Sequence, residues 1–233
     1  MAPHNLSECC DAICAYIDNP EITVEELMHF VKGPDFPTGG IIQGRQGIKD
    51  AFETGRGRIV IRSKTEIEVN DSGRETIVVT EIPYMVNKRE MIEKIAEMVE
   101  SKKIEGIAYI NDETTMKGVR IVIRLKKDAN SNVVLNTLFK YTPLQSSFSV
   151  NNVALVNGRP RTLNLKDLIK YFVKHRHEVI LRRTRFDLDK AQKRAHILEG
   201  LLKALDVIDE IIRIIRASKS VEEAKNELMA TFA

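Results

Sequence analysis

The sequence contains no apolar run that approaches the ~20 residues of a membrane-spanning helix. Residues 1–5 carry neither a basic segment nor an apolar core, so we expect no secretory signal peptide. From these two absences we expect a cytoplasmic protein with no membrane partner. The chain has 233 residues, 43% hydrophobic and 30% charged, which is usual for a soluble globular protein that buries a core.

Cysteine is scarce and confined to one short segment. Cys9, Cys10 and Cys14 are odd in number, which argues against a disulfide framework. A metal site that combines them with His4 lacks a fourth ligand and a recognised spacing, so we expect no bound metal. We instead expect the cysteines to be small buried residues of one helix.

The usual catalytic motifs are also missing. Gly39, Gly40, Gly44 and Gly47 are not followed by Gly-Lys-Ser/Thr and do not follow a clear strand, so we expect no nucleotide site. No paired carboxylates and no Ser-His-Asp order are apparent. The acidic side chains between residues 21 and 26 are typical of a helix start rather than of a metal cluster.

The net charge is only +3, but the charges are unevenly distributed. Residues 1–36 carry seven acidic side chains and one lysine, whereas residues 41–64 and 170–194 are mainly basic. Basic zones in a nearly neutral chain indicate a surface for a polyanion. The candidate phosphate contacts are Arg45, Arg56, Arg58, Arg62, Arg176, Arg182 and Arg183.

The segment Gly55-Arg56-Gly57-Arg58 lies between an expected helix end and an expected strand. Glycine permits close approach of the backbone to a partner, and arginine can donate two hydrogen bonds to one phosphate. The same four residues could instead form a turn with solvated arginines. The segment by itself leaves both interpretations open.

The second basic zone lies on an expected long helix. Arg182 follows Glu178 by four residues, a spacing at which an ion pair stabilises an exposed helix face. Arg183 and Asp187 have the same spacing. These pairs leave positive charge in excess on the first half of the helix, which we expect to lie near the polyanion. From Lys190 onward we expect a solvated face.

Periodicity predicts two helices followed by an α+β domain. Residues 6–17 and 23–30 follow helical spacing, and Thr23 with Glu26 forms a capping box. Further helices are expected at 46–53, 87–103 and 131–141, and strands at 58–62, 65–69, 75–80, 106–111, 119–126 and 147–155. We expect turns at Asp71-Ser72-Gly73 and at Asn157-Gly158. This order predicts an α+β fold with a mixed or antiparallel sheet and packed helices.

A long helix is expected to follow. If unbroken from residue 165 to 205, it would be ~60 Å long, so it requires a partner helix or a second chain. Asp206 is expected to cap a following helix, and Ser220 with Glu223 forms a capping box before a last helix. The predicted fold class is therefore α+β followed by a long coiled-coil helix.

Six segments resemble one known family, in the family's order and over nearly the whole chain. They are Gly33–Gly40, Gly55–Arg58, Glu81–Lys88, Leu144–Phe148, Asn164–Asp167 and Ala195–Gly200. The family comprises the A subunits of bacterial DNA gyrase and topoisomerase IV, the type IIA DNA topoisomerases. We favour gyrase, with topoisomerase IV as the alternative, since the wrapping domain that distinguishes gyrase lies outside this sequence.

The resemblance implies a domain organisation. Residues 1–39 would be a helical lead-in from the DNA-cleaving core, and residues 40–163 the α+β tower domain. Residues 164–217 would be the long coiled-coil helix, and residues 218–233 the start of the exit-gate helices. The tower would support bent double-stranded DNA, and the coiled coil would link that DNA gate to the exit gate during ATP-dependent supercoiling.

The resemblance also implies that this sequence has no catalytic residue. The family's DNA-cleaving tyrosine follows an arginine and lies upstream of Gly33–Gly40, whereas none of the five tyrosines here follows an arginine. We expect an inactive internal piece with an engineered Met1 and a cut end. The parent enzyme would be an A2B2 assembly with gyrase B, through which Mg²⁺ and ATP would bind. The rival hypothesis is a non-enzymatic helical assembly module.

Overall fold

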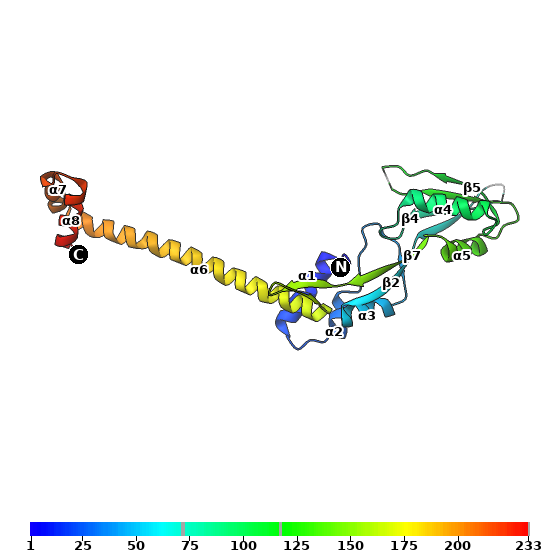
Figure 1. The fold of residues 1–233 in the computed structure, drawn as a ribbon, viewed down its shortest axis with the longest axis horizontal. Helices are drawn as coiled ribbons and strands as arrows, with labels where there is room; N and C mark the ends of the chain where they lie inside the picture. Colours follow the sequence, from blue (N-terminus) through cyan, green and yellow to red (C-terminus); the bar gives the residue numbers. More distant parts are fainter. Residues whose placement is uncertain (71–72, 117, 233) are drawn as a thin grey trace. The chain divides into compact units, whose positions relative to one another are not determined.

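The computed structural model describes residues 1–70, 73–116 and 118–232 (Figure 1). Asp71 and Ser72 of the predicted turn lie outside the described residues. The chain divides into two compact units, residues 1–173 and residues 174–233. Its antiparallel sheets, packed helices and long helix confirm the predicted α+β class.

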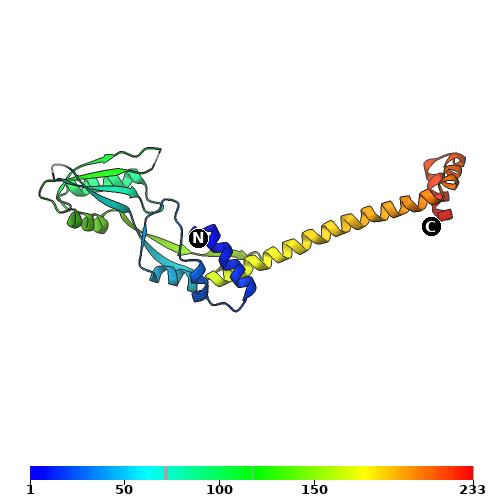
Figure 2. The same ribbon diagram turned by 180° about the vertical axis from the view of Figure 1, so that it is seen from behind.

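Two helices, α1 (Leu6–Asp18) and α2 (Val24–Phe30), open the first unit. The Asn5 side chain accepts hydrogen bonds from the first turn of α1, which satisfies backbone donors that have no partner within the helix. Thr23 and Glu26 form the predicted capping box of α2. Helix α1 shares a hydrophobic core with the start of the long helix, beside which it lies (Figure 2).

The cysteines lie on the outer side of α1. Ala12 is fully buried, whereas Cys10 and Cys14 are exposed and Cys9 is half-buried. The prediction that the cysteines are buried is therefore wrong, because the helix packs through its opposite face. Among the described residues, no group of three or more His, Cys, Asp or Glu side chains could hold a metal ion.

A three-stranded antiparallel sheet follows, in the order β1-β2-β7. Its strands are β1 (Ile41–Gln43), β2 (Arg56–Arg62) and β7 (Gln145–Asn151). Strand β1 was not predicted, because three residues are too few for an alternating pattern and the strand forms only by pairing with β2. Helix α3 (Gln46–Thr54) packs against one face of this sheet.

Glycines bring α3 directly against β2. A Cβ atom on Gly57 would overlap the carbonyl oxygen of Gly47, and a Cβ on Gly47 would overlap the carbonyl group of Arg58. Gly55 ends α3 in the left-handed conformation, with φ 76°. The close neighbours of these glycines are thus other segments of the same chain: α3 for Gly57, β2 for Gly47 and the Leu163 backbone for Gly55.

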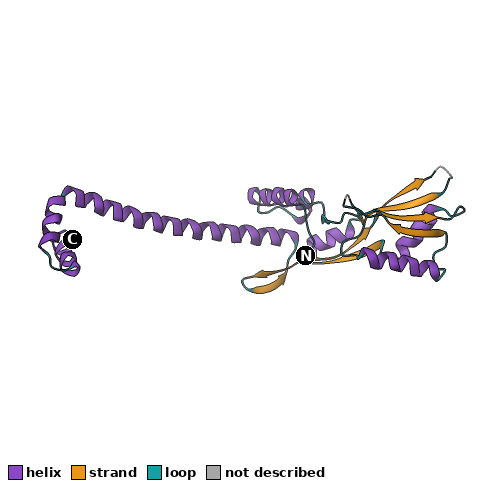
Figure 3. Cartoon of the chain, turned by 90° about the horizontal axis from the view of Figure 1, so that it is seen from above, coloured by secondary structure: helices purple, strands orange, loops and turns teal. Residues whose placement is uncertain are grey.

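The second sheet has four antiparallel strands in the order β3-β4-β6-β5. These strands are β3 (Lys64–Val69), β4 (Glu75–Glu81), β5 (Ile107–Asp112) and β6 (Ile121–Leu125). Helices α4 (Lys88–Glu100) and α5 (Ser131–Tyr141) cover one face of it (Figure 3). Their apolar stripes and the inward side chains of β4 and β6 form a second hydrophobic core.

The single strand predicted over residues 147–155 is two strands. Buried Asn152 separates β7 from β8 (Val153–Val156), which pairs with β9 (Arg159–Thr162) as an antiparallel ribbon. The predicted turn at Asn157-Gly158 joins the two strands, and both turn residues have positive φ. Periodicity could not reveal the break, because β7 and β8 are both extended and differ only in their partner strands.

An aromatic cluster lies where the chain passes from one sheet to the other. Phe36 stacks on Tyr84, with ring centroids 5.2 Å apart, and meets Phe148 edge-on at 5.5 Å. Tyr84 and Phe148 are 5.7 Å apart. The backbone N–H of Gly40 donates to the Glu81 carboxylate at 2.6 Å. Three segments that carry the family resemblance therefore contact one another here.

Helix α6 (Leu165–Asp206) is the predicted long helix, and its length of 42 residues confirms the expectation. It is followed by α7 (Ile208–Ala217) and α8 (Val221–Phe232). Asp206 does not cap α7, because α6 continues through it and Val207 takes the cap position without a side-chain hydrogen bond. No helix among the described residues has the length and apolar content needed to cross a membrane.

The capping box before α8 differs slightly from the prediction. The backbone N–H of Glu223 donates to the Ser220 hydroxyl at 3.2 Å, as expected. The Glu223 carboxylate, however, accepts from the N–H of Lys219, one residue before the predicted donor, at 2.9 Å. The start of α8 is therefore still fixed by both side chains.

Replacing Phe36 with alanine should destabilise the first unit, because its ring is only 7% exposed and two other aromatic rings contact it. We expect the free energy of unfolding, measured in urea, to fall by about 3 kcal/mol. Phe186→Ala is the matched control, since that ring is 67% exposed, and should change it by less than about 0.5 kcal/mol. Equal losses in the two variants would contradict the role of the aromatic cluster.

Gly57→Ala should also destabilise the first unit, because the added methyl group would push α3 away from β2. We expect a loss of about 1–3 kcal/mol in the free energy of unfolding. Gly200 of α6 has no neighbouring atom within 4 Å of an added Cβ, so Gly200→Ala should instead stabilise by about 0.5–1 kcal/mol. Unchanged urea unfolding of Gly57→Ala would show that α3 and β2 are not in close contact.

Candidate nucleic-acid interface

One face of the β1-β2-β7 sheet carries three of the predicted arginines. Side chains alternate along a strand, so residues two apart point to the same face. Ile59 and Ile61 are buried beneath α3, whereas Arg56, Arg58 and Arg62 lie on the opposite face. The fold thus sorts the charged residues of β2 away from its apolar residues.

Pairing with β7 and β1 completes this face with uncharged side chains, all polar except Ile41. Arg56 pairs with Asn151, and Arg58 pairs with Ser149. Directly paired residues of two antiparallel strands share a face. We call this surface the arginine face; it consists of Ile41, Gln43, Arg56, Arg58, Val60, Arg62, Gln145, Ser147, Ser149 and Asn151. None of these ten positions is acidic.

The three arginines of this face differ in their exposure and in the contacts of their side chains. Arg56 and Arg58 are exposed, and their guanidinium groups make no hydrogen bond or ion pair within the described part of the chain. Arg62 is half-buried, because its Nε donates to Gln145 Oε1 at 2.6 Å and its guanidinium lies 4.9 Å from the Phe139 ring centroid. These contacts hold Arg62 in place and still leave most of its five donors unused.

Arg45 lies elsewhere, just before α3. It lines a pocket of about 550 Å³ formed by residues of α2, α3 and the segments beside them. Lys49 in the same pocket lies 2.9 Å from Glu25 and 3.5 Å from Glu53. The hydrogen bond with Glu25 raises the pKa of Lys49 and lowers the pKa of Glu25, so this pair compensates its own charge. Arg45 has no ion-pair partner in the described residues.

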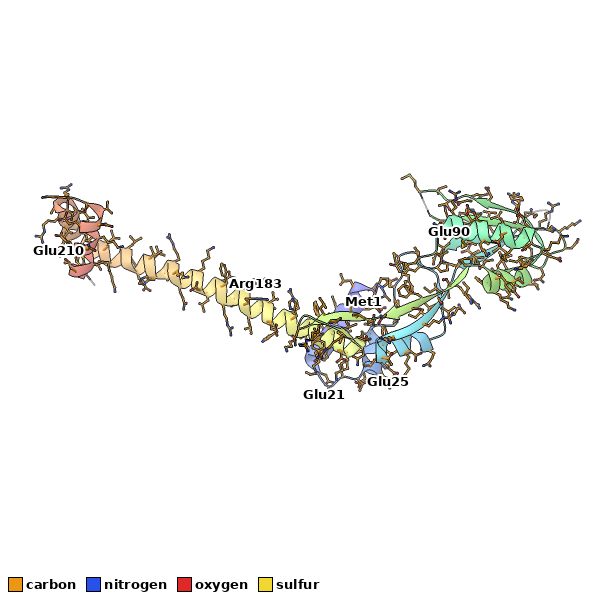
Figure 4. All side chains as sticks on the ribbon, viewed as in Figure 1. Met1, Glu21, Glu25, Glu90, Arg183 and Glu210 are labelled. Carbon is orange, nitrogen blue, oxygen red and sulfur yellow. The ribbon has the colours of Figure 1, made fainter. Side chains whose placement is uncertain are left out.

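Arg176, Arg182 and Arg183 are exposed on α6, in the second unit (Figure 4 labels Arg183). The predicted ion pairs of Arg182 and Arg183 with nearby acidic residues are not formed within the described chain. The ion pair that α6 does form there joins Lys193 and Asp189 at 2.8 Å. The positive charge of these arginines is therefore less compensated than the spacing suggested.

Sequence reasoning missed the uncharged part of the arginine face. Ser147, Ser149 and Asn151 are exposed, and a visible signal was that every second residue from Gln145 to Asn151 is polar. Hydroxyl, amide and guanidinium groups all donate to phosphate oxygens in protein–DNA contacts. The arrangement is thus suited to bind a phosphate backbone without a cofactor or metal.

Comparison with known proteins shows which family the chain resembles over its whole length. The family model for the A subunits of DNA gyrase and topoisomerase IV matches residues 1–233. The chain is 56% identical over 232 residues to the DNA gyrase A subunit of Clostridium acetobutylicum, and 56% identical over 233 residues to that of Leptospira biflexa. Both matches cover 100% of this chain but 28% of the relative's length, so the chain spans less than a third of these relatives. The chain belongs to the family formed by the A subunits of DNA gyrase and topoisomerase IV.

Proposed function

We propose that the arginine face binds the phosphate backbone of double-stranded DNA within a type IIA DNA topoisomerase. The observation that carries this proposal is a sheet face on which three arginines lie among serine, asparagine and glutamine side chains and no carboxylate. DNA carries a dense row of phosphates, and each arginine that neutralises one releases a bound counterion. An acid-free face avoids repulsion of those phosphates.

The chain would act as part of a larger A subunit of the gyrase kind. The relatives in the comparison are named as A subunits of DNA gyrase, which favours gyrase over the topoisomerase IV alternative. Two A subunits and two gyrase B subunits would form the cytoplasmic assembly, with Mg²⁺ and ATP bound through the B subunits. The enzyme would pass one duplex through another, and this chain would supply no catalytic residue.

Each part of the chain has a proposed role in that assembly. Residues 1–39 lead in from the DNA-cleaving core, and residues 40–163 form a tower domain that supports bent DNA. Residues 164–217, which contain α6 and α7, form the coiled-coil region that links the DNA gate to the exit gate, and residues 218–233 begin the exit gate. Arg45 and the α6 arginines Arg176, Arg182 and Arg183 are proposed as further phosphate contacts outside the arginine face.

The order of the side chains on β2 suits contact along one DNA strand. Arg56 and Arg58 are two residues apart, so their Cα atoms are separated by about 6.6 Å along the strand. The paired residues Asn151 and Ser149 offer neutral donors beside them. Arg62, held by Gln145, would extend the same row. Because these groups contact the backbone rather than base edges, binding should not depend on DNA sequence.

The double variant Arg56→Ala/Arg58→Ala should weaken binding to duplex DNA of any sequence. The slope of log K against log salt concentration should fall in magnitude by about 1.8, because two phosphate contacts are lost. Fluorescence anisotropy between about 50 and 200 mM salt would measure the slope. Both side chains are exposed, so urea unfolding should be unchanged.

Arg89→Ala provides the matched control. Arg89 is also exposed, but it lies on α4 and is paired with Glu93 at 2.8 Å, so its loss should leave the slope unchanged. If the wild-type chain has no detectable affinity for DNA at low salt, the proposal fails. The rival hypothesis, a helical assembly module with merely solvated arginines, would then be favoured.

A further inference from the structure

We propose that the pocket between α2 and α3 binds a small organic anion, in which an apolar ring or chain carries a phosphate or carboxylate group. The pocket has a volume of about 550 Å³, which is within the range of small-molecule sites. Its residues Ile48 and Lys49 belong to α3, on the opposite side of the β1-β2-β7 sheet from the arginine face. This inference therefore concerns a site other than the arginine face.

Two apolar side chains form the floor of the pocket. Met28 of α2 is half-buried and Ile48 of α3 is 7% exposed, and both pack in the core of the first sheet. Gly33 packs closely on Ile48, since a Cβ atom on Gly33 would lie 2.9 Å from Ile48 Cδ1. The sulfur atom of methionine makes favourable contacts with aromatic rings. The floor can therefore receive an apolar ring or chain without a rearrangement of the core.

Positive charge surrounds this floor. The basic side chains that line the pocket are Lys32, Arg45, Lys49 and His29, and Glu25 is the one acidic side chain among the described lining residues. Lys32 and Arg45 are exposed, and neither side chain forms a hydrogen bond or an ion pair within the described part of the chain. An arginine can donate two hydrogen bonds to one phosphate or carboxylate, and a lysine adds a compact positive charge. The two residues can thus bind an anionic group without losing a contact that the fold requires.

Lys49 joins the two helices across the pocket. Its Nζ atom lies 2.9 Å from a carboxylate oxygen of Glu25 on α2 and 3.5 Å from one of Glu53 on α3. These carboxylates compensate the charge of Lys49, so the attraction for an anion comes mainly from Lys32 and Arg45. The hydrogen bond with Glu25 also raises the pKa of Lys49, which keeps its ammonium group charged. The ion pair thus links the two walls of the pocket.

The combination of an apolar floor and a basic rim favours a small organic anion over the DNA backbone. A DNA duplex presents its phosphates along the outside of a rod, where charge dominates the contact. Small-molecule sites, in contrast, combine apolar walls with a few polar groups that fix the orientation of the ligand. Arg45 can bind the phosphate of either ligand, so the two are distinguished by whether the apolar part of the ligand adds affinity.

The test is a titration of the 233-residue chain with phenyl phosphate, which carries one ring and one phosphate, followed by proton–nitrogen correlation NMR. We expect backbone signals of α2 and α3 to shift. The Kd should be about tenfold lower than that for inorganic phosphate, because the ring contacts Met28 and Ile48. Lys32→Gln/Arg45→Gln should raise the Kd for phenyl phosphate about tenfold or more, because two charged hydrogen-bond donors are lost. Both side chains are exposed, so urea unfolding should not change.

Arg74→Gln/Arg89→Gln is the matched control, since it removes two exposed positive charges outside the pocket and should leave the Kd for phenyl phosphate unchanged. An equal rise in Kd in this control would show that the anion responds only to the net charge of the chain, and would overturn the inference. Equal affinity for phenyl phosphate and inorganic phosphate would overturn it as well, as would an unchanged Kd in Lys32→Gln/Arg45→Gln.

DNA binding gives an independent outcome. Phenyl phosphate binding does not require the arginine face, so an unchanged salt slope in Arg56→Ala/Arg58→Ala would leave this inference intact. If Lys32→Gln/Arg45→Gln lowers the salt slope on duplex DNA by about 1.8 while wild type does not bind phenyl phosphate, the two residues contact DNA only and the inference fails. Phenyl phosphate binding that depends on both residues supports the site whatever the slope.

Discussion

The contact among Phe36, Tyr84 and Phe148 is the constraint on which the first unit depends. It joins the segment before β1, the segment after β4 and strand β7. The Ser63 N–H, which lies between β2 and β3, donates to the Leu144 carbonyl oxygen at 2.8 Å. Each ring comes from a different segment, so the cluster closes only when all three segments have folded. All three rings belong to the hydrophobic core of the first sheet, and Tyr84 comes from the segment that follows β4 of the second sheet, so the cluster ties that segment to the first core.

Glycine and arginine have different roles in the Gly-Arg-Gly-Arg segment. The two glycines are required by the fold. Gly55 ends α3, and Gly57 allows α3 to contact β2. Arg56 and Arg58 make no contact that the fold requires. The two interpretations that the sequence left open treat the four residues as one group, whereas in the structure the glycines are structural and the arginines are available for a ligand.

Local patterns predicted the elements well, because helices and strands of ordinary length follow their own periodicity. The capping box at Thr23 and the length of α6 are examples. Three of the errors concern tertiary partners: β1 exists only beside β2, the break at Asn152 reflects a change of partner strand, and the exposure of Cys10 depends on which face of α1 is packed. For the same reason, one sequence could not show which arginines share a surface.

Side chains of β2 alternate between the α3 side and the arginine face. The fold is therefore more sensitive to a change in the number of residues in this strand than to a substitution at one of its exposed positions. A single-residue deletion between Gly55 and Arg62 would exchange the two faces of the strand, placing guanidinium groups beneath α3 and isoleucines in solvent. A substitution at an exposed arginine removes one charge and leaves the core intact. Related sequences should therefore keep the number of residues in this strand constant.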